Sequence, residues 1–256
     1  MLPRLSLPDV TLCAVSSVNL AATLRALHVC LENISFGACV LLTDRDVAPG
    51  DARIRVERVA PLTSTAAYSQ VVLKDLADHV PTSHCLVVQW DGHVLNADRW
   101  QPEFLDYDYI GASWPQFDDG HDVGNGGFSL RSRRLMLACR DPRFDGRHAE
   151  DVAIGRVNRP LLESLGLRFA PRALADRFSA ERRGDPLTTF GYHGVFNMPR
   201  ALGIAEFWEV YRALEEFGTV RHDFWPLLRE MGRGPGGTRR MARMLFDRLG
   251  GAAHGR

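Results

Sequence analysis

The sequence predicts an α/β fold, with a mixed, mostly parallel sheet flanked by helices and a C-terminal helical extension. Short apolar runs without helical periodicity, at 10–15, 39–43 and 86–88, are typical of buried strands. Amphipathic segments alternate with these runs, and a strand–helix–strand order favours parallel neighbours joined by right-handed crossovers. After Pro199 only helical patterns remain. We therefore expect residues 1–200 to form the α/β domain and residues 201–256 an extension packed on or flanking it.

Composition narrows the class of protein. The 256 residues are 45% hydrophobic, enough for a full core, and the net charge is zero. Zero net charge gives the whole chain no bias toward nucleic acid or an anionic membrane. The first residues do not resemble a signal peptide and no apolar run reaches membrane-spanning length, so we expect a cytoplasmic protein, either free or peripheral to the inner membrane. The scattered cysteines are expected to be buried, reduced thiols; they are Cys13, Cys30, Cys39, Cys85 and Cys139.

The first half of the chain predicts three strands and two helices before the central strand. The strand at 10–15 is followed by Asn19, which is a suitable N-cap for a helix. That helix has an apolar stripe formed by Leu20, Leu24, Leu27, Leu31 and Ile34. The strand at 39–43 ends in Asp44, and 54–59 is a third strand. Residues 65–80 are expected to be helical, with Tyr68 on the face toward the sheet.

The strand at 86–88 ends in Gln89-Trp90-Asp91-Gly92. Ligands of open α/β sheets bind at the carboxyl ends of strands, so Asp91 is placed to hold a metal ion or a hydroxyl-rich ligand. The alternative is that Asp91 is a turn or helix-cap residue. Trp90 can stack on a sugar ring, although a large aromatic residue more often serves packing.

A glycine-rich segment follows at 124–127, before a strand-like run at 128–130. An extended segment at 106–112 precedes it, and Trp114 is expected near the opening of the site. Glycine lets the backbone approach a ligand that a Cβ atom would exclude, although such a segment can also be a flexible turn. Residues 232–237 fit the letters GxGxxG, but they follow a predicted helix and not a strand, so they are not a Rossmann dinucleotide fingerprint. No GxxxxGK[ST] occurs, which excludes a P-loop.

The second half predicts helices at 132–139 and 149–165 and a strand at 167–170. Glu150 and Asp151 begin the second of these helices, where carboxylates are stabilised by the helix dipole without any further function. His193 lies between glycines, and a lone histidine is more often a structural hydrogen-bonding group than a ligand.

The extension predicts helices at 204–217, 224–231 and 238–249. The last has an apolar face of Met241, Met244, Leu245 and Leu249, with arginines around it. Such a helix can dock on the domain, on a partner protein or on an anionic membrane surface, or it can simply be solvated.

Three long motifs carry a resemblance to a known family. QWDGHVLNADRW, EFLDYDYIGASW and VGNGGFSLRS resemble the DUF5672 family, which is similar to glycosyltransferases of the GT-A type. The resemblance continues through Glu150-Asp151, FAP, RFSAE and FGYHG and covers roughly residues 10–198. It implies a GT-A-like, Rossmann-like fold and transfer of a sugar from a nucleotide-diphosphate sugar to a glycan or other hydroxyl acceptor, for example in bacterial surface polysaccharide synthesis.

The resemblance also assigns roles. Asp91 would be the main ligand of Mn²⁺ or Mg²⁺ and His193 a later one. GT-A enzymes commonly have Asp-x-Asp here, and Gln89 replaces the first acid, which weakens the case for a metal. Asp151 would be the general base, with Glu150 orienting the acceptor or capping the helix. Substrate-binding roles fall to Tyr68, Gln89, Trp90, Gly92, Trp114, Asn125, Gly126 and Gly127.

Two questions stay open at this level. On a helical wheel Glu150 lies nearer the apolar stripe and Asp151 to its side, whereas related acidic pairs favour the second acid as base. The resemblance also allows a binding module of GT-A type without turnover, and Asp91 with His193 allows, more weakly, a metal-dependent hydrolase.

Overall fold

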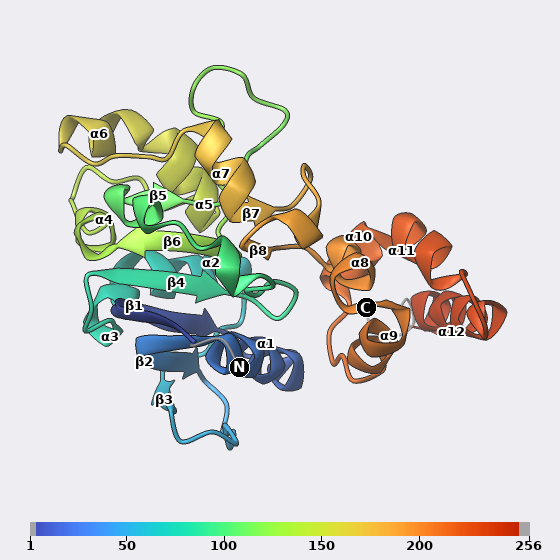
Figure 1. Ribbon diagram of the computed structural model, residues 1–256. Coiled ribbons are helices and arrows are strands. Elements are labelled where there is room, and N and C mark those ends of the chain that lie inside the picture. Colours follow the sequence, from blue (N-terminus) through green and yellow to red (C-terminus); the bar gives the residue numbers. More distant parts are fainter. Residues whose placement is uncertain (1–3, 251–256) are drawn as a thin grey trace.

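The computed structural model describes residues 4–250 and contains a mixed six-stranded sheet in the order β3-β2-β1-β4-β6-β5 (Figure 1). Strands β1 to β4 are parallel, whereas β6 runs antiparallel to both β4 and β5. The strands are β1 (Leu5–Val15), β2 (Ile34–Thr43), β3 (Ile54–Arg58), β4 (His84–Val88), β5 (Tyr109–Ile110) and β6 (Phe128–Ser132). The predicted mixed, mostly parallel sheet flanked by helices is therefore confirmed.

Helix α1 (Leu20–Asn33) crosses from β1 to β2 and ends one residue earlier than its apolar stripe predicts. Ile34 is extended and begins β2, paired with Leu5. The apolar stripe included Ile34 because an apolar residue suits a buried helix face and a buried strand equally well, and Ile34 is fully buried. A β-branched residue followed by an alternating Ser-Phe pattern favours the strand.

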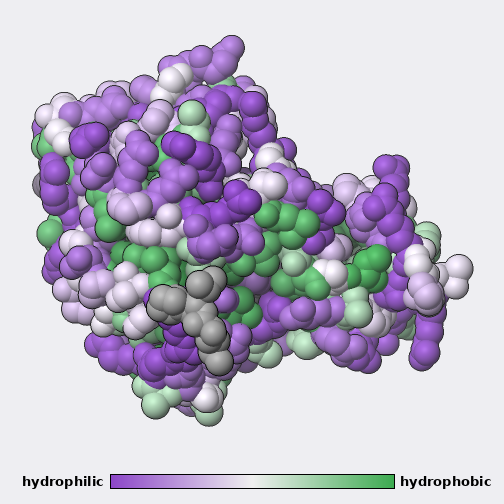
Figure 2. Space-filling model, in the orientation of Figure 1, coloured by the Kyte–Doolittle hydropathy of each residue, from purple (hydrophilic) through white to green (hydrophobic). Residues whose placement is uncertain are grey.

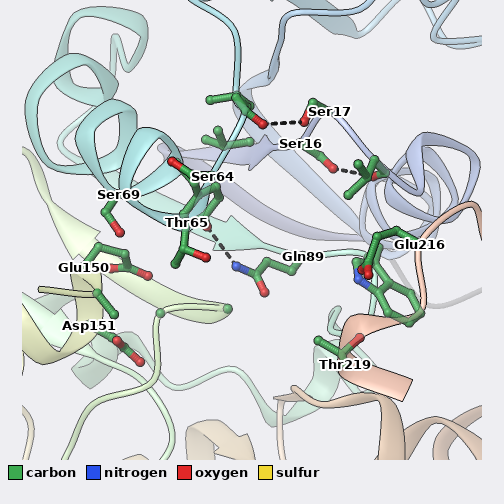
Figure 3. A pocket seen from close by; sticks show the side chains of 18 of the residues that line it. Ser16, Ser17, Ser64, Thr65, Ser69, Gln89, Glu150, Asp151, Glu216 and Thr219 are labelled. Carbon is green, nitrogen blue, oxygen red and sulfur yellow. Dashed lines mark hydrogen bonds between the residues drawn. The ribbon is translucent and has the colours of Figure 1, made fainter. Parts of the chain in front are cut away.

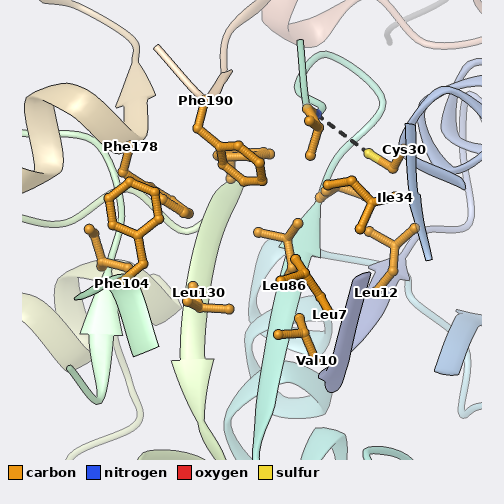
Figure 4. Close-up of a cluster of buried hydrophobic side chains, with 14 of the residues drawn as sticks. Leu7, Val10, Leu12, Cys30, Ile34, Leu86, Phe104, Leu130, Phe178 and Phe190 are labelled. Carbon is orange, nitrogen blue, oxygen red and sulfur yellow. Dashed lines mark hydrogen bonds between the residues drawn. The ribbon is translucent and has the colours of Figure 1, made fainter. Parts of the chain in front are cut away.

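Two hydrophobic layers cover the sheet. On one face, α1 and α7 (Arg172–Phe178) pack over alternate strand residues such as Leu12 and Leu86, together with Phe104, Phe178 and Phe190 (Figure 4). On the other face lies the predicted 65–80 helix, which is divided into α2 (Thr65–Gln70), a π-helical turn at Val71–Asp75 and α3 (Leu76–His79). Because β1 to β4 run parallel, their carboxyl ends lie at one common edge between these two layers.

The second half is more broken than expected. The predicted 149–165 helix consists of α5 (Glu150–Val152), a π-helical turn at Ala153–Val157 and α6 (Arg159–Ser164), because Pro160 has no N–H for a continuous helix. Other short elements of this half include α4 (Arg133–Ala138), β7 (Ser179–Ala180) and β8 (Gly191–Tyr192). The expected strand at 167–170 is a single bridge from Phe169 to Tyr109.

The C-terminal helices pack around a separate hydrophobic cluster beside the sheet (Figure 1). They are α8 (Met198–Leu202), α9 (Ile204–Arg212), α10 (Gly218–His222), α11 (Phe224–Met231) and α12 (Gly237–Gly250). The predicted apolar face of α12 is only half used. Met244 is fully buried in the cluster, whereas Leu245 and Leu249 are exposed.

The five cysteines are free and buried, as predicted. Within residues 4–250, no helix combines the length and apolar character needed to cross a bilayer.

Candidate active site

A cleft of about 590 Å³ opens at the carboxyl ends of β1 and β4 (Figure 3). The loop after β1 is tied to the loop before α2 by Ser17, whose hydroxyl donates to the Leu62 carbonyl at 3.2 Å. Both loops present further polar side chains at the cleft, including Ser16, Ser64 and Thr65. The opposite wall comes from the glycine-rich segment and the start of α5. The sheet edge that the sequence indicated therefore carries a cleft lined by polar side chains.

Gln89 lies on the floor of this cleft and is held at both ends. Its Nε2 donates to the Tyr68 hydroxyl at 2.9 Å, and its Oε1 lies 3.2 Å from His193 Nε2. Burial raises the pKa of Tyr68, which keeps its hydroxyl neutral. Gln89 therefore connects a phenol on α2 to the histidine after β8.

His193 is the centre of a polar cluster. Its Nδ1 lies 3.3 Å from Glu181 Oε1 and 3.1 Å from Asn125 Nδ2, and its Nε2 lies 3.4 Å from Asp91 Oδ1. Burial alone would lower the pKa of His193, but Asp91 and Glu181 outweigh burial and raise it to about 10. The imidazole ring is therefore held between two carboxylates, with Glu181 at Nδ1 and Asp91 at Nε2.

Asp91 faces a second, smaller cavity. This cavity, about 220 Å³, is also lined by Glu181, Arg182 and His193, and His193 forms part of the wall of both cavities. Asp91 is 2% exposed, and its Oδ1 accepts no hydrogen bond from residues 4–250, although His193 Nε2 lies 3.4 Å away. A buried carboxylate oxygen without a donor is costly unless a cation or another ligand satisfies it.

Glu150 and Asp151 have different surroundings. Glu150 is buried in an ion pair with Arg131, Oε2 to Nη2 at 2.8 Å, and burial raises its pKa although Arg131 opposes the shift. Arg131 is itself fully buried, donating to Ser129 Oγ and to the Gly126 carbonyl. Asp151 is half-buried and lines the cleft. The arrangement agrees with the helical wheel, since Glu150 points inward and Asp151 to the side.

The glycines at this site leave space that other side chains or backbone atoms of the protein occupy. A Cβ atom on Gly126 would collide with the Glu150 carboxylate, and one on Gly127 would collide with the His193 ring. At Gly92 a Cβ atom would lie 2.6 Å from the Tyr192 carbonyl oxygen. Gly126 and Gly127 still line the cleft, but the immediate reason for their lack of side chains is packing.

Asn125 has a left-handed φ of 60°, and its Oδ1 accepts from the Gly127 N–H at 3.2 Å. The two tryptophans are placed differently. Trp90 lines the cleft, whereas Trp114 is 8% exposed and packs over Gly124, away from it. The expectation that Trp114 lies near the opening is wrong, because removal of the Cβ at Gly124 leaves a space that the indole fills.

The C-terminal extension completes the rim of the cleft with residues 215–219, which we call the rim segment. Glu216 and Thr219 line the cleft from this segment (Figure 3). Asn19 anchors it. Its Oδ1 accepts from the Glu215 and Glu216 N–H groups at 2.8 and 3.0 Å, and its Nδ2 donates to the Glu216 carbonyl at 3.0 Å. Asn19 stands at the start of α1 as predicted, but its side chain makes no helix-capping bond.

The charge balance of the cleft is unusual for a site expected to bind a diphosphate. Its charged lining residues are Glu150, Asp151, Glu216 and His193, with no lysine or arginine among the lining residues of the described chain. Residues 4–250 also contain no cluster of three or more His, Cys, Asp or Glu side chains arranged to hold a metal ion. Protein ligands alone therefore do not form a closed metal centre.

The sequence did not predict four of the groups that form this site. Arg131, Glu181, Asn19 and the rim segment gained no role from the motifs. Glu181 carried a signal, since it ends the RFSAE motif, but nothing local indicated that it meets His193. The other contacts join residues up to 197 positions apart.

The chain is similar to several solved structures at low sequence identity. A glycosyltransferase involved in glycosylation of the major capsid of PBCV-1 aligns with a TM-score of 0.46 and 12% identity, over 73% of this chain and 93% of that one. The mannosyltransferase PcManGT from Pyrobaculum calidifontis, solved with GDP-Man and Mn²⁺, aligns with a TM-score of 0.43 and 10% identity, over 97% and 76%. A197 from STIV aligns with a TM-score of 0.37 and 13% identity, over 63% and 80%.

No curated protein matches the sequence significantly. A family model described as "Protein of unknown function (DUF5672)" matches residues 53–193, more than half of the chain. The match includes β3, β4, the glycine-rich segment, the acidic pair of α5 and His193. On this match, the chain belongs to the DUF5672 family.

Proposed function

We propose that this protein transfers a sugar from a nucleoside-diphosphate sugar to a hydroxyl acceptor. The observation that carries the proposal is the juxtaposition, at one sheet edge, of a half-buried Asp151 carboxylate and the Asp91–His193 pair. A donor in the cleft would contact hydroxyl groups of the β1 and α2 loops through its nucleoside. Its diphosphate would then lie toward His193, where the two cavities meet. Residues 1–200 would form the catalytic domain and 201–256 an extension that closes it.

The residues present fit a divalent cation, Mn²⁺ or Mg²⁺, that enters with the diphosphate. Asp91 Oδ1 accepts no hydrogen bond from the described residues, and His193 Nε2, 3.4 Å away, would bind the ion after losing its proton, while Glu181 engages Nδ1. A carboxylate behind a histidine is the usual support of a metal-binding imidazole. Asp91 and His193 would hold the ion and phosphate oxygens would supply further ligands, since these ions commonly bind through few protein groups. Bound there, the cation would neutralise charge on the leaving diphosphate.

Asp151 would act as the general base. It would take the proton of the acceptor hydroxyl as the oxygen bonds to the anomeric carbon and the bond from that carbon to the diphosphate breaks. Glu150 is a poor candidate because Arg131 already neutralises it inside the protein. Glu150 would instead fix the glycine-rich wall against which the donor sugar lies.

The test is a panel of nucleotide sugars, each incubated with Mn²⁺ or Mg²⁺, with and without hydroxyl acceptors, while released nucleotide is measured. A transferase releases nucleoside diphosphate faster when its acceptor is present, and Asp151→Asn abolishes most of that increase. Acceptor-independent release would instead identify a hydrolase. Ligand-induced stabilisation without any release would identify a binding module, which the replacement of an acid by Gln89 favours.

A further inference from the structure

Helix α12 presents an apolar surface that no described part of the chain covers. Met244 is buried against the other C-terminal helices, so the opposite side of α12 faces outward. Phe246 is 69% exposed and Leu249 is 75% exposed on that side. Trp225 of α11, 64% exposed, lies next to the last turn of α12, because the Arg248 guanidinium lies 5.6 Å from its ring centroid. We call Trp225, Leu245, Phe246 and Leu249 the apolar patch.

Positive charge is concentrated around this patch. Residues 221–250 contain seven arginines against three acidic residues, a net charge of +4, whereas the whole chain is neutral. Arg239 and Arg243 are exposed on α12 itself, and of the acidic residues Asp247 is paired with Arg243. In Figure 2, hydrophobic side chains of the C-terminal helices lie among strongly hydrophilic ones. A protein that is neutral overall is thus basic at the end where its aromatic and aliphatic side chains are exposed.

We propose that the apolar patch and its surrounding arginines bind an anionic lipid surface. An exposed apolar strip bordered by arginine is the pattern of helices that lie in a membrane interface, and tryptophan and phenylalanine partition well into that zone. Arginine near such a surface is attracted by anionic headgroups. A second copy of the chain fits less well, because it would bring two basic surfaces together.

The patch lies on the C-terminal helices and shares no residue with the cleft, so this proposal does not depend on the glycosyl-transfer proposal. It is nevertheless linked to the cleft by structure, since α10 begins within the rim segment and leads directly into α11. Binding through the patch would hold the rim of the cleft at a fixed distance from the lipid surface.

The experiment measures cosedimentation of the full chain with vesicles of phosphatidylcholine, alone or mixed with phosphatidylglycerol. We expect binding to the anionic vesicles only, weakened by salt, since about 1 M salt shortens the screening length to about 3 Å. The double variant Phe246→Ser/Leu249→Ser should bind at least about tenfold more weakly, because it loses two exposed apolar side chains. Arg239→Gln should also weaken binding. The matched control is Leu187→Ser, which removes a 42% exposed leucine outside the patch and should bind as the parent does.

A second readout follows Trp225. Binding should shift tryptophan emission to shorter wavelength in the parent, and Trp225→Phe should remove most of that shift. Failure of the parent to bind anionic vesicles, or equal binding by the Phe246→Ser/Leu249→Ser variant with an unchanged melting temperature, would overturn the proposal. So would a dimer in sedimentation velocity that this variant dissociates, because the patch would then be a contact between two copies.

Discussion

Glu150→Gln should mainly lower stability and Asp151→Asn should mainly lower activity, although the two residues are neighbours on α5. Glu150→Gln leaves the Arg131 charge buried without its partner. Breaking a buried ion pair costs about 3–5 kcal/mol. Arg131 keeps its bonds to Ser129 and Gly126, so we expect the lower end, about 3 kcal/mol. For a chain of this size that corresponds to a fall in melting temperature of about 6–12 °C.

Asp151→Asn should leave the melting temperature nearly unchanged, because the side chain is half-buried and forms no ion pair within residues 4–250. It should lower kcat by a factor on the order of 10²–10⁴, the usual contribution of a general base. Thermal unfolding followed by circular dichroism, together with steady-state transfer kinetics at a temperature where both variants are folded, separates the effects. A stable Glu150→Gln variant that has lost activity more completely than Asp151→Asn would refute the assignment of the base to Asp151.

Three further substitutions test the other parts of the site. Gly127→Ala should abolish activity and Mn²⁺-dependent donor binding, because the new Cβ collides with His193; Gly120→Ala, whose Cβ meets nothing within 4 Å, should cost only the strain of its left-handed backbone. Asp91→Asn should weaken nucleotide-sugar binding in the presence of Mn²⁺ at least about tenfold by calorimetry, while metal-free nucleotide binding changes little; equal losses in both conditions would contradict a metal role. Asn19→Gly keeps the left-handed backbone but loses three hydrogen bonds to the rim segment, so the donor KM should rise while kcat is largely retained.

The sheet and the position of the candidate site could be predicted from the periodicity of apolar residues and from the polar residues that follow the strands. The strand before Gln89 and the position of Asp91 follow from a short apolar run and the rule for open sheets, without knowledge of any distant contact. Ile34 and Trp114 show the limit. Each is apolar and buried in either interpretation, so hydrophobicity alone did not decide the secondary structure of one or the location of the other.

The site's internal contacts were beyond local reasoning for a different reason. A glycine in a sequence indicates that something comes close, but not what. At Gly127 the close neighbour is His193, contributed by a segment 66 positions later in the chain. Likewise, Glu181 reads as a loop residue until β7 and β8 pair and bring it to the imidazole ring. Such pairings depend on tertiary structure, which propensity and period do not encode.

The hydrogen bonds of Asn19 have a consequence for the order in which the protein assembles. The residue belongs to the first loop of the sheet, yet its partners lie almost two hundred positions later. Contacts of such large sequence separation form late, after the local elements have already folded. During synthesis the sheet can therefore pair before the rim exists, and the cleft gains its final shape only when the C-terminal helices dock. A pulse-labelled nascent chain that ends before residue 215 would have a folded sheet and an open, incomplete cleft.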